Sequence, residues 1–343
     1  MDYKKNTIQL DLASYRHYWR GQAKVGKTSL FRDLVVELYG DAKYGLLLSI
    51  GQEIGYKALD NLYAHDCPEW VDLVEVVDDL TDNKKSNEFK ILAIDTVDEL
   101  IELAEKEVLA IHRREKSTDA TSINAALGGY GAGKKKARSL VENIISKLER
   151  AGYGMIYVSH VKVKDITEKA TDVAYQQLTG ALEFSYDAIF SDRADVMAMF
   201  VTESETKDER LKSSKRYIYF RSTNFIDAGS RLSNLPEKIE LNAKNYISAI
   251  NSALETSSGV SGKDVVKARK QEEKIREEKA DSIIEEKKAV ESFRKEVLSF
   301  AKGLSPEVIK VKKEELLGKG LPVKFADVED MKVLKSIHEV LTS

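Results

Sequence analysis

The sequence contains few of the residues that build disulfides or membrane spans. Cys67 is the single cysteine among 343 residues, so the chain forms no internal disulfide and no zinc site built from cysteine pairs. No apolar run approaches the ~18 residues that a membrane-spanning helix requires. The opening residues, MDYKKNTIQLDL, lack the apolar stretch of a secretion signal. These absences favour a reducing, cytoplasmic location without a membrane partner.

A strong excess of either charge is also absent. The chain has 54 Lys+Arg against 57 Asp+Glu, a net charge of −3. This balance excludes a histone-like, wholly basic nucleic-acid binder but leaves room for local basic patches. Charged residues make up 32% of the chain, above the usual ~25%, so some segment must concentrate them.

The composition divides the chain into two parts. Up to about residue 242, short apolar runs alternate with amphipathic helical patterns, which predicts an α/β domain with a mostly parallel sheet. After a Ser/Gly-rich joint at 257–262, residues 263–296 hold 11 Lys+Arg and 10 Asp+Glu without Gly or Pro. This predicts a long solvated helix with i,i+4 ion pairs, followed by two short helices. We therefore divide the chain into residues 1–256 and a charged helical region, 257–343.

The pattern of apolar residues predicts individual elements of the first part. Strands are expected at Tyr15–Arg20, Tyr44–Ile50, Val71–Val77, Phe89–Asp95 and Tyr153–Ser159. Helices are expected at Lys27–Leu38, Val97–Arg113 and Lys135–Arg150. Further strands are expected at Asp195–Val201, Arg216–Ser222 and Lys238–Leu241.

One motif carries clear chemistry. Residues 21–28, GQAKVGKT, match the phosphate-binding pattern GxxxxGK[ST] between an expected strand and an expected helix. Glycines let the backbone wrap a phosphate, and the helix N-terminus adds its dipole. Lys27 is expected to reach the β- and γ-phosphates of ATP, and Thr28 to hold Mg²⁺. The nucleotide-binding residues are expected to be Gly21, Gln22, Ala23, Lys24, Val25, Gly26, Lys27, Thr28 and Ser29.

A second candidate lies at the end of the run Phe89–Asp95. An Asp at the C-terminal tip of a strand sits where ligands bind in open α/β sheets. Asp95 is therefore the candidate carboxylate for Mg²⁺. The alternative is that Asp95 caps the following helix, a role that Thr96 is equally able to fill.

Two places in the sequence offer a carboxylate to activate water. Glu53 follows the strand Tyr44–Ile50 and is expected to face the same crevice as Asp95. Asp98 and Glu99 come soon after Asp95 but inside the predicted helix. A third reading leaves Glu53 as an ordinary surface-loop glutamate.

The order of these features resembles the RecA-like ATPases, and most closely the phage-encoded proteins that act with single-strand DNA-binding protein in annealing and recombination. The resemblance spans about residues 14–242. It implies a RecA-like P-loop NTPase core with a mostly parallel sheet, a water-activating role for Glu53, and a γ-phosphate sensor role for His160. RecA has Gln at the sensor position, so His160 departs from that pattern.

Two basic segments predict contact with nucleic acid. Gly128–Gly133, with Tyr130 at its centre, precedes Lys134, Lys135, Lys136 and Arg138, which can neutralise phosphates. A second expected loop, Val161–Thr179, carries Lys162, Lys164, Lys169 and Tyr175. In RecA-like proteins the loops at these two places touch single-stranded DNA. The alternative is a solvated surface loop with no ligand.

The sequence thus predicts an ATPase, stimulated by single-stranded DNA, that assembles with copies of itself and works in the cytoplasm, the host cytoplasm if a phage encodes it. Single-strand DNA-binding protein is an expected partner. An Arg near Arg216 or Arg221 is expected to reach the ATP of a neighbouring protomer. The rival hypotheses are an AAA-like P-loop ATPase that serves as a helicase loader or packaging-type motor, and a nucleotide-gated binding module with little turnover.

Overall fold

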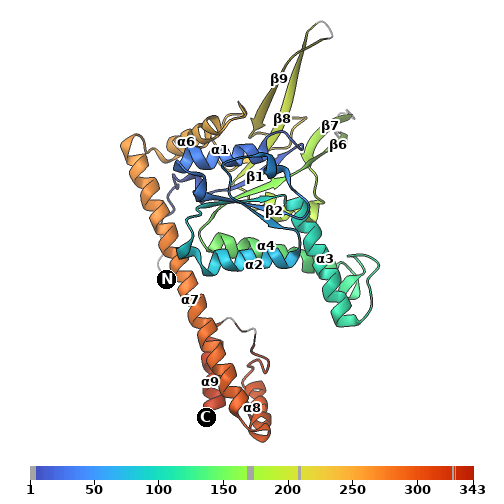
Figure 1. Ribbon diagram of the computed structural model, residues 1–343, viewed down its shortest axis with the longest axis vertical. Coiled ribbons are helices and arrows are strands. Elements are labelled where there is room, and N and C mark those ends of the chain that lie inside the picture. The colour runs from blue at the N-terminus through green and yellow to red at the C-terminus, as the bar shows by residue number, and fades with distance from the viewer. Residues whose placement is uncertain (1–4, 168–173, 208–209, 327, 329) are drawn as a thin grey trace. The chain divides into compact units, whose positions relative to one another are not determined.

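The computed structural model describes residues 5–167, 174–207, 210–326, 328 and 330–343 (Figure 1). Two compact units make up the chain, Met1–Glu277 and Glu278–Ser343. The first unit ends beyond residue 256 because the first turns of a long helix pack onto it. The functional division at 256/257 stays a prediction.

A mixed sheet forms the centre of the first unit. Its strands are β1 (Arg16–Gly21), β2 (Gly45–Ile50), β3 (Ala64–Cys67), β4 (Ile91–Asp95), β5 (Gly154–Ser159), β8 (Val196–Lys207), β9 (Arg210–Tyr219), β10 (Gly229–Ser230) and β11 (Lys238–Glu240). They lie in the order β11-β9-β8-β1-β5-β4-β2-β3, with β10 on β8. From β8 to β3 the neighbours are parallel, and the pairs of β8, β9, β10 and β11 with one another are antiparallel. The predicted α/β class is confirmed.

Helices cover both faces of this sheet (Figure 1). One face carries α1 (Lys27–Tyr39) and α6 (Ala243–Ser258), and the other carries α2 (Trp70–Asp82), α3 (Val97–Lys116), α4 (Ala132–Arg150) and α5 (Phe184–Ser191). Alternate residues of each strand enter opposite cores, as a pleated strand requires. In β4, Ala93 packs with the α1 side and Ile94 with the α2–α4 side.

The strand predicted at Val71–Val77 is wrong, because these residues form the first half of α2. Its buried positions, Leu73, Val77 and Leu80, have the i, i+4, i+7 spacing of a helix face, while Val71 is exposed. A capping box of Glu69 and Asp72 fixes the start of this helix. Helical periodicity and capping outweigh the strand preference of the valines.

The central strand β1 carries buried polar side chains that find partners in α6. Trp19 Nε1 donates to the hydroxyl of Tyr246 (2.9 Å), which also lies 2.7 Å from His17 Nδ1. His17 Nε2 faces the Leu12 carbonyl (3.3 Å), which only accepts, so the neutral ring carries its proton on Nε2 and Nδ1 accepts from the Tyr246 hydroxyl. This network satisfies the ring nitrogens of His17 and Trp19 inside a strand that is buried on both sides.

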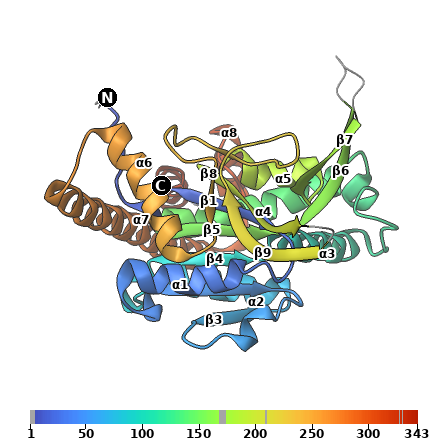
Figure 2. The ribbon, with the colours of Figure 1, turned by 90° about the horizontal axis from the view of Figure 1, so that it is seen from above.

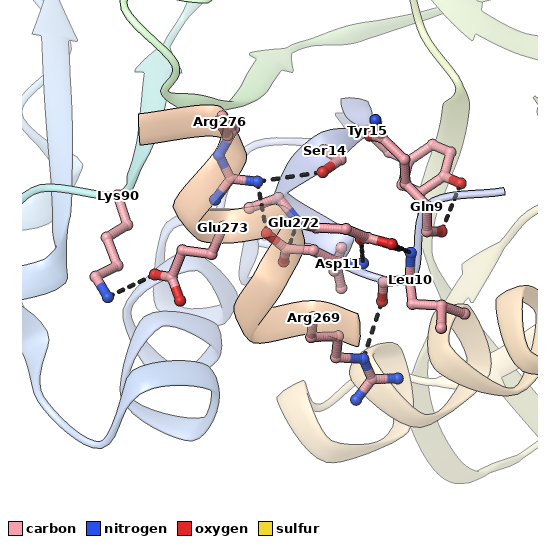
Figure 3. Close-up of polar contacts among 12 residues, drawn as sticks. Gln9, Leu10, Asp11, Ser14, Tyr15, Lys90, Arg269, Glu272, Glu273 and Arg276 are labelled. Atoms are coloured by element: carbon pink, nitrogen blue, oxygen red, sulfur yellow. Dashed lines mark hydrogen bonds and ion pairs between the residues drawn. The ribbon is translucent and has the colours of Figure 1, made fainter. Parts of the chain in front are cut away.

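The long charged helix α7 (Lys263–Gly303) is confirmed. Its first turns do not lie free in solvent but hold the N-terminal segment (Figure 3). Glu272 accepts hydrogen bonds from the backbone N–H groups of Leu10 and Asp11, and Arg276 pairs with Asp11. Glu273 pairs with Lys90 just before β4. These charged contacts hold the first turns of α7 against the N-terminal segment and Lys90.

The second unit is a small helical cluster. The end of α7, α8 (Pro306–Gly318) and α9 (Met331–Thr342) enclose an apolar core that includes Val297, Leu316, Ile337 and Val340. The two short helices predicted for this region are confirmed.

The network at His17 makes stability depend on pH. Burial lowers the pKa of His17 from 6.5 to about 4, so the unfolded chain binds more protons than the folded chain between these values. The free energy of unfolding should fall as pH drops from about 6.5 to 4, by up to roughly 3 kcal/mol from this residue. Urea melts of wild type and His17→Gln across this range test it. Equal pH slopes in the two proteins would contradict the prediction.

Candidate nucleotide-binding site

The predicted catalytic residues gather at one edge of the sheet. Strands β1, β5, β4 and β2 are parallel, so their C-terminal ends share that edge. Asp95 ends β4 and lies opposite Ser49 on one side and Val158 on the other. The P-loop, the segment after β2 with Glu53, and His160 therefore meet around Asp95.

The P-loop joins β1 to α1, as predicted. A Cβ on Gly21 would lie 2.7 Å from Phe200 Cβ, so only glycine fits there. Gly26 has φ +110°, in the left-handed region that favours glycine. Among the described residues no side chain caps α1, so the N–H groups of its first turn can bind a phosphate.

Lys27 is buried inside this loop. Its Nζ donates to the carbonyls of Gly21 (2.7 Å) and Gln22 (3.0 Å). Burial lowers the pKa of the ammonium, and nearby carboxylates, first Asp95, oppose the shift. The acidic neighbours thus help to keep a cation at the phosphate-binding loop.

Asp95 and Thr28 form the candidate metal site. Thr28 Oγ1 donates to Asp95 Oδ2 at 2.8 Å, and Asp95 is only 4% exposed. Burial raises the pKa of Asp95, while the Thr28 hydrogen bond and Lys27 act the other way. Thr96 caps α3 through a 3.4 Å bond from the Glu99 N–H, so the helix does not need Asp95 as its cap.

This pair fits Mg²⁺ through its oxygens. Mg²⁺ prefers oxygen ligands and is usually held by one or two protein groups together with phosphates and water. In the part of the chain that the structure describes, no cluster of three or more His, Cys, Asp or Glu residues could hold a metal alone. Thr28 and Asp95 would therefore hold the ion jointly with a bound nucleotide.

The sequence offered Glu53, Asp98 and Glu99 as carboxylates to activate water. Asp98 holds His160, and the two glutamates differ in their surroundings. Glu53 Oε1 accepts from the Gly55 N–H at 3.0 Å, and its charge acts on both Lys27 and Asp95. Glu99 instead lies against the backbone of Gly51. A Cβ added to Gly51 would lie only 2.3 Å from Glu99 Oε2. Of the two glutamates, Glu53 is therefore the one whose charge acts on Lys27 and Asp95.

His160 follows β5 and is held by Asp98, which the sequence offered as a carboxylate to activate water and not as a partner of His160. The backbone N–H of His160 donates to Asp98 Oδ2 (2.9 Å), and its Nδ1 lies 3.8 Å from the same oxygen. The charge of Asp98 also acts on Lys27. Its position three residues after Asp95, on the first turn of α3, was the available signal.

Arg216 contacts its own P-loop. Its Nη1 donates to the Val25 carbonyl at 3.2 Å, beside Gly26. Arg221 donates to backbone carbonyls of Leu232 and Ser233 in the same chain. Both arginines thus have partners within this protomer.

The basic segments have more regular structure than the expected loops. Lys134, Lys135 and Lys136 lie in the first turns of α4, and the second segment is a hairpin of β6 (Val161–Thr167) and β7 (Ala174–Gly180). Figure 2 shows this hairpin extending away from the main sheet. Lys162 and Lys164 lie on β6, and Lys169 lies outside the described residues.

A comparison with protein families decides the class of this site. A family described as an AAA domain matches residues 13–232, about two thirds of the chain. The chain belongs to this family. The match covers the P-loop, Asp95, His160 and both basic segments. No curated protein matches the chain.

Family membership and fold agree on the coarse function. The chain is a P-loop ATPase-type protein that binds nucleotide, with a mostly parallel α/β core and C-terminal helices. None of the helices among the described residues is long and apolar enough to cross a membrane.

Substitution of the two glutamates should separate their roles. Glu53→Gln should keep ATP bound but slow hydrolysis by roughly 10²-fold or more, because a water-activating base acts mainly in the transition state. Glu99→Gln serves as the matched control and should retain turnover. Phosphate release and ATP binding are measured for both variants. Normal hydrolysis by Glu53→Gln with loss in Glu99→Gln would reverse the assignment.

Proposed function

We propose that this protein hydrolyses ATP with Mg²⁺ and acts on single-stranded DNA, in recombination or annealing of the phage type. The observation that carries the DNA part is the continuity between His160 and the β6–β7 hairpin. His160 lies near Asp95 in the ATP site, and the next residue, Val161, begins β6 with its two exposed lysines. A displacement of His160 that follows a change at the γ-phosphate would be passed through one peptide bond to Val161, and so to the surface of the strand that carries these lysines.

The chemistry of that surface favours single strands. Lys135 and Lys136 are exposed on the first turns of α4, where the helix dipole also attracts phosphate. Two nearby aromatic rings are exposed, Tyr130 before α4 and Phe184 at the start of α5, the latter at 88%. Exposed rings beside lysines suit unpaired bases, which stack on them, better than a closed duplex.

The residues of the ATP site divide the work of hydrolysis. Lys27 and the N–H groups at the start of α1 would hold the phosphates, and Thr28 and Asp95 would hold Mg²⁺, which supplies positive charge to the transferred phosphoryl group. Glu53 would take a proton from the attacking water, and His160 would sense the γ-phosphate. Such catalysis is mostly positioning and electrostatics, so small displacements of these residues suffice to regulate it.

The same proposal includes assembly with further copies of the chain and contact with single-strand DNA-binding protein. Both rest on the resemblance to phage RecA-like proteins. The cytoplasm is the proposed location.

An ATPase assay with a salt titration tests the DNA part. Replacing Lys134, Lys135 and Lys136 together by Ala should flatten the slope of log affinity against log salt by roughly 2 if all three touch phosphate. The stimulation of ATP turnover by a single-stranded oligonucleotide should fall as well. The matched control replaces three lysines of α8, Lys310, Lys312 and Lys313, and should keep both properties.

Other outcomes would favour the rival functions. Stimulation by duplex or by a protein partner alone would point to a loader or packaging motor. Tight ATP binding without turnover would point to a nucleotide-gated binding module. If plots of log affinity against log salt concentration coincide for wild type and the α4 triple variant, these lysines do not contact DNA.

A further inference from the structure

An acidic side chain lies within the basic surface, the name we use for the predicted DNA contacts on α4 and β6: Lys134, Lys135, Lys136, Arg138, Lys162 and Lys164. Lys134 Nζ donates to both carboxylate oxygens of Glu183, between β7 and α5, at 2.7 and 2.9 Å, and Ser185 Oγ donates to Oε1 at 3.2 Å. The contact joins residues 49 positions apart in the chain and links the start of α4 to the start of α5. It lowers the pKa of Glu183, first through the Lys134 hydrogen bond. At neutral pH the pair is therefore ionised on both sides.

The residues around Glu183 engage two more of the predicted DNA contacts. We call Ala181–Ser185 the clasp. Lys162 Nζ donates to the backbone carbonyls of Ala181 (2.9 Å) and Leu182 (3.1 Å). Arg138 Nη1 donates to the carbonyl of Ser185 at 3.0 Å. One short segment thus holds cations from both basic elements.

The remaining lysines of the surface behave differently. Lys135, Lys136 and Lys164 are exposed and form no ion pair with any described residue. A polynucleotide would meet these three free charges first. The clasp separates the cations that are open to a phosphate from those that already have an oxygen partner.

We propose that Glu183 is an internal phosphate mimic, which occupies Lys134 until a phosphate of single-stranded nucleic acid displaces it. The inference rests on the proposed function and deepens it, because it names how the DNA surface is kept partly neutral. A carboxylate offers Lys134 the same kind of anionic oxygen as a phosphate. The pair is half-exposed, with side chains 28% and 56% accessible, so a phosphate can reach the lysine.

The competition has a measurable size. Exposed ion pairs are weak, so the carboxylate should reduce affinity for DNA only a few-fold. Displacement also frees Glu183, so that the hydrogen bond from Arg138 to the Ser185 carbonyl is left to link α4 to the clasp. Binding of nucleic acid would therefore loosen the clasp, which follows the β6–β7 hairpin, and this hairpin begins directly after His160.

Titration of a labelled single-stranded oligothymidylate tests the inference. Glu183→Gln should bind roughly two- to five-fold more tightly than wild type, with an unchanged salt slope, because both proteins form the same Lys134–phosphate contact in the complex. Glu88→Gln removes the same charge from a similarly exposed ion pair, with Lys43, that includes no predicted DNA contact, and is the matched control. It should gain less.

A double variant separates competition from general charge removal. In a Lys134→Ala background, Glu183→Gln should give no gain, because the competed lysine is absent. A gain of equal size in that background would overturn the inference in favour of long-range repulsion. Circular dichroism melts confirm that each variant is folded.

Failure of this inference differs from failure of the proposed function. If wild type binds the oligonucleotide and Glu183→Gln binds it equally, Glu183 is no phosphate mimic, but the DNA function stands. If neither protein binds the oligonucleotide while ATP is still hydrolysed, both the DNA function and the mimic are overturned.

Discussion

The hydrogen bond from Thr28 to Asp95 connects the two halves of the ATP site. Strands β1 and β4 are not neighbours, since β5 lies between them, yet the loop after β1 must reach the tip of β4 for one metal ion to touch both. Parallel pairing through β5 sets that distance. Lys27, Glu53 and His160 then take their places around a buried carboxylate.

One continuous stretch of chain connects the ATP site to the basic surface. β5 ends next to His160, the proposed sensor, and the chain continues through β6 and β7 into the clasp and α5. Asp98 holds the beginning of this stretch, and Lys134 holds its end through Glu183. Nucleotide and polynucleotide would therefore act on the two ends of the same segment. This arrangement would give a physical basis for the proposed stimulation of the ATPase by DNA.

Local motifs were predictable from the sequence, and contacts between distant residues were not. The P-loop and the strand that ends at Asp95 were found because the residues that define each of them are consecutive in the sequence. Val71–Val77 misled because valines favour strands, while the helix depends on spacing and on a capping box. The partners of Lys134 and Arg216 depend on residues 49 and 191 positions away, which no local pattern reveals. Asp98 had a local signal, its helical spacing from Asp95.

The metal dependence of ATP binding tests the site most directly. Calorimetric titration with ATP should be done in Mg²⁺ and in EDTA, for wild type and for Asp95→Asn. If Thr28 and Asp95 hold the ion, wild type should bind ATP more tightly with Mg²⁺, and Asp95→Asn should lose most of that gain while keeping its metal-free affinity. An equal gain from Mg²⁺ in both proteins would contradict the assignment of Asp95 and, with it, the proposed geometry of the ATP site.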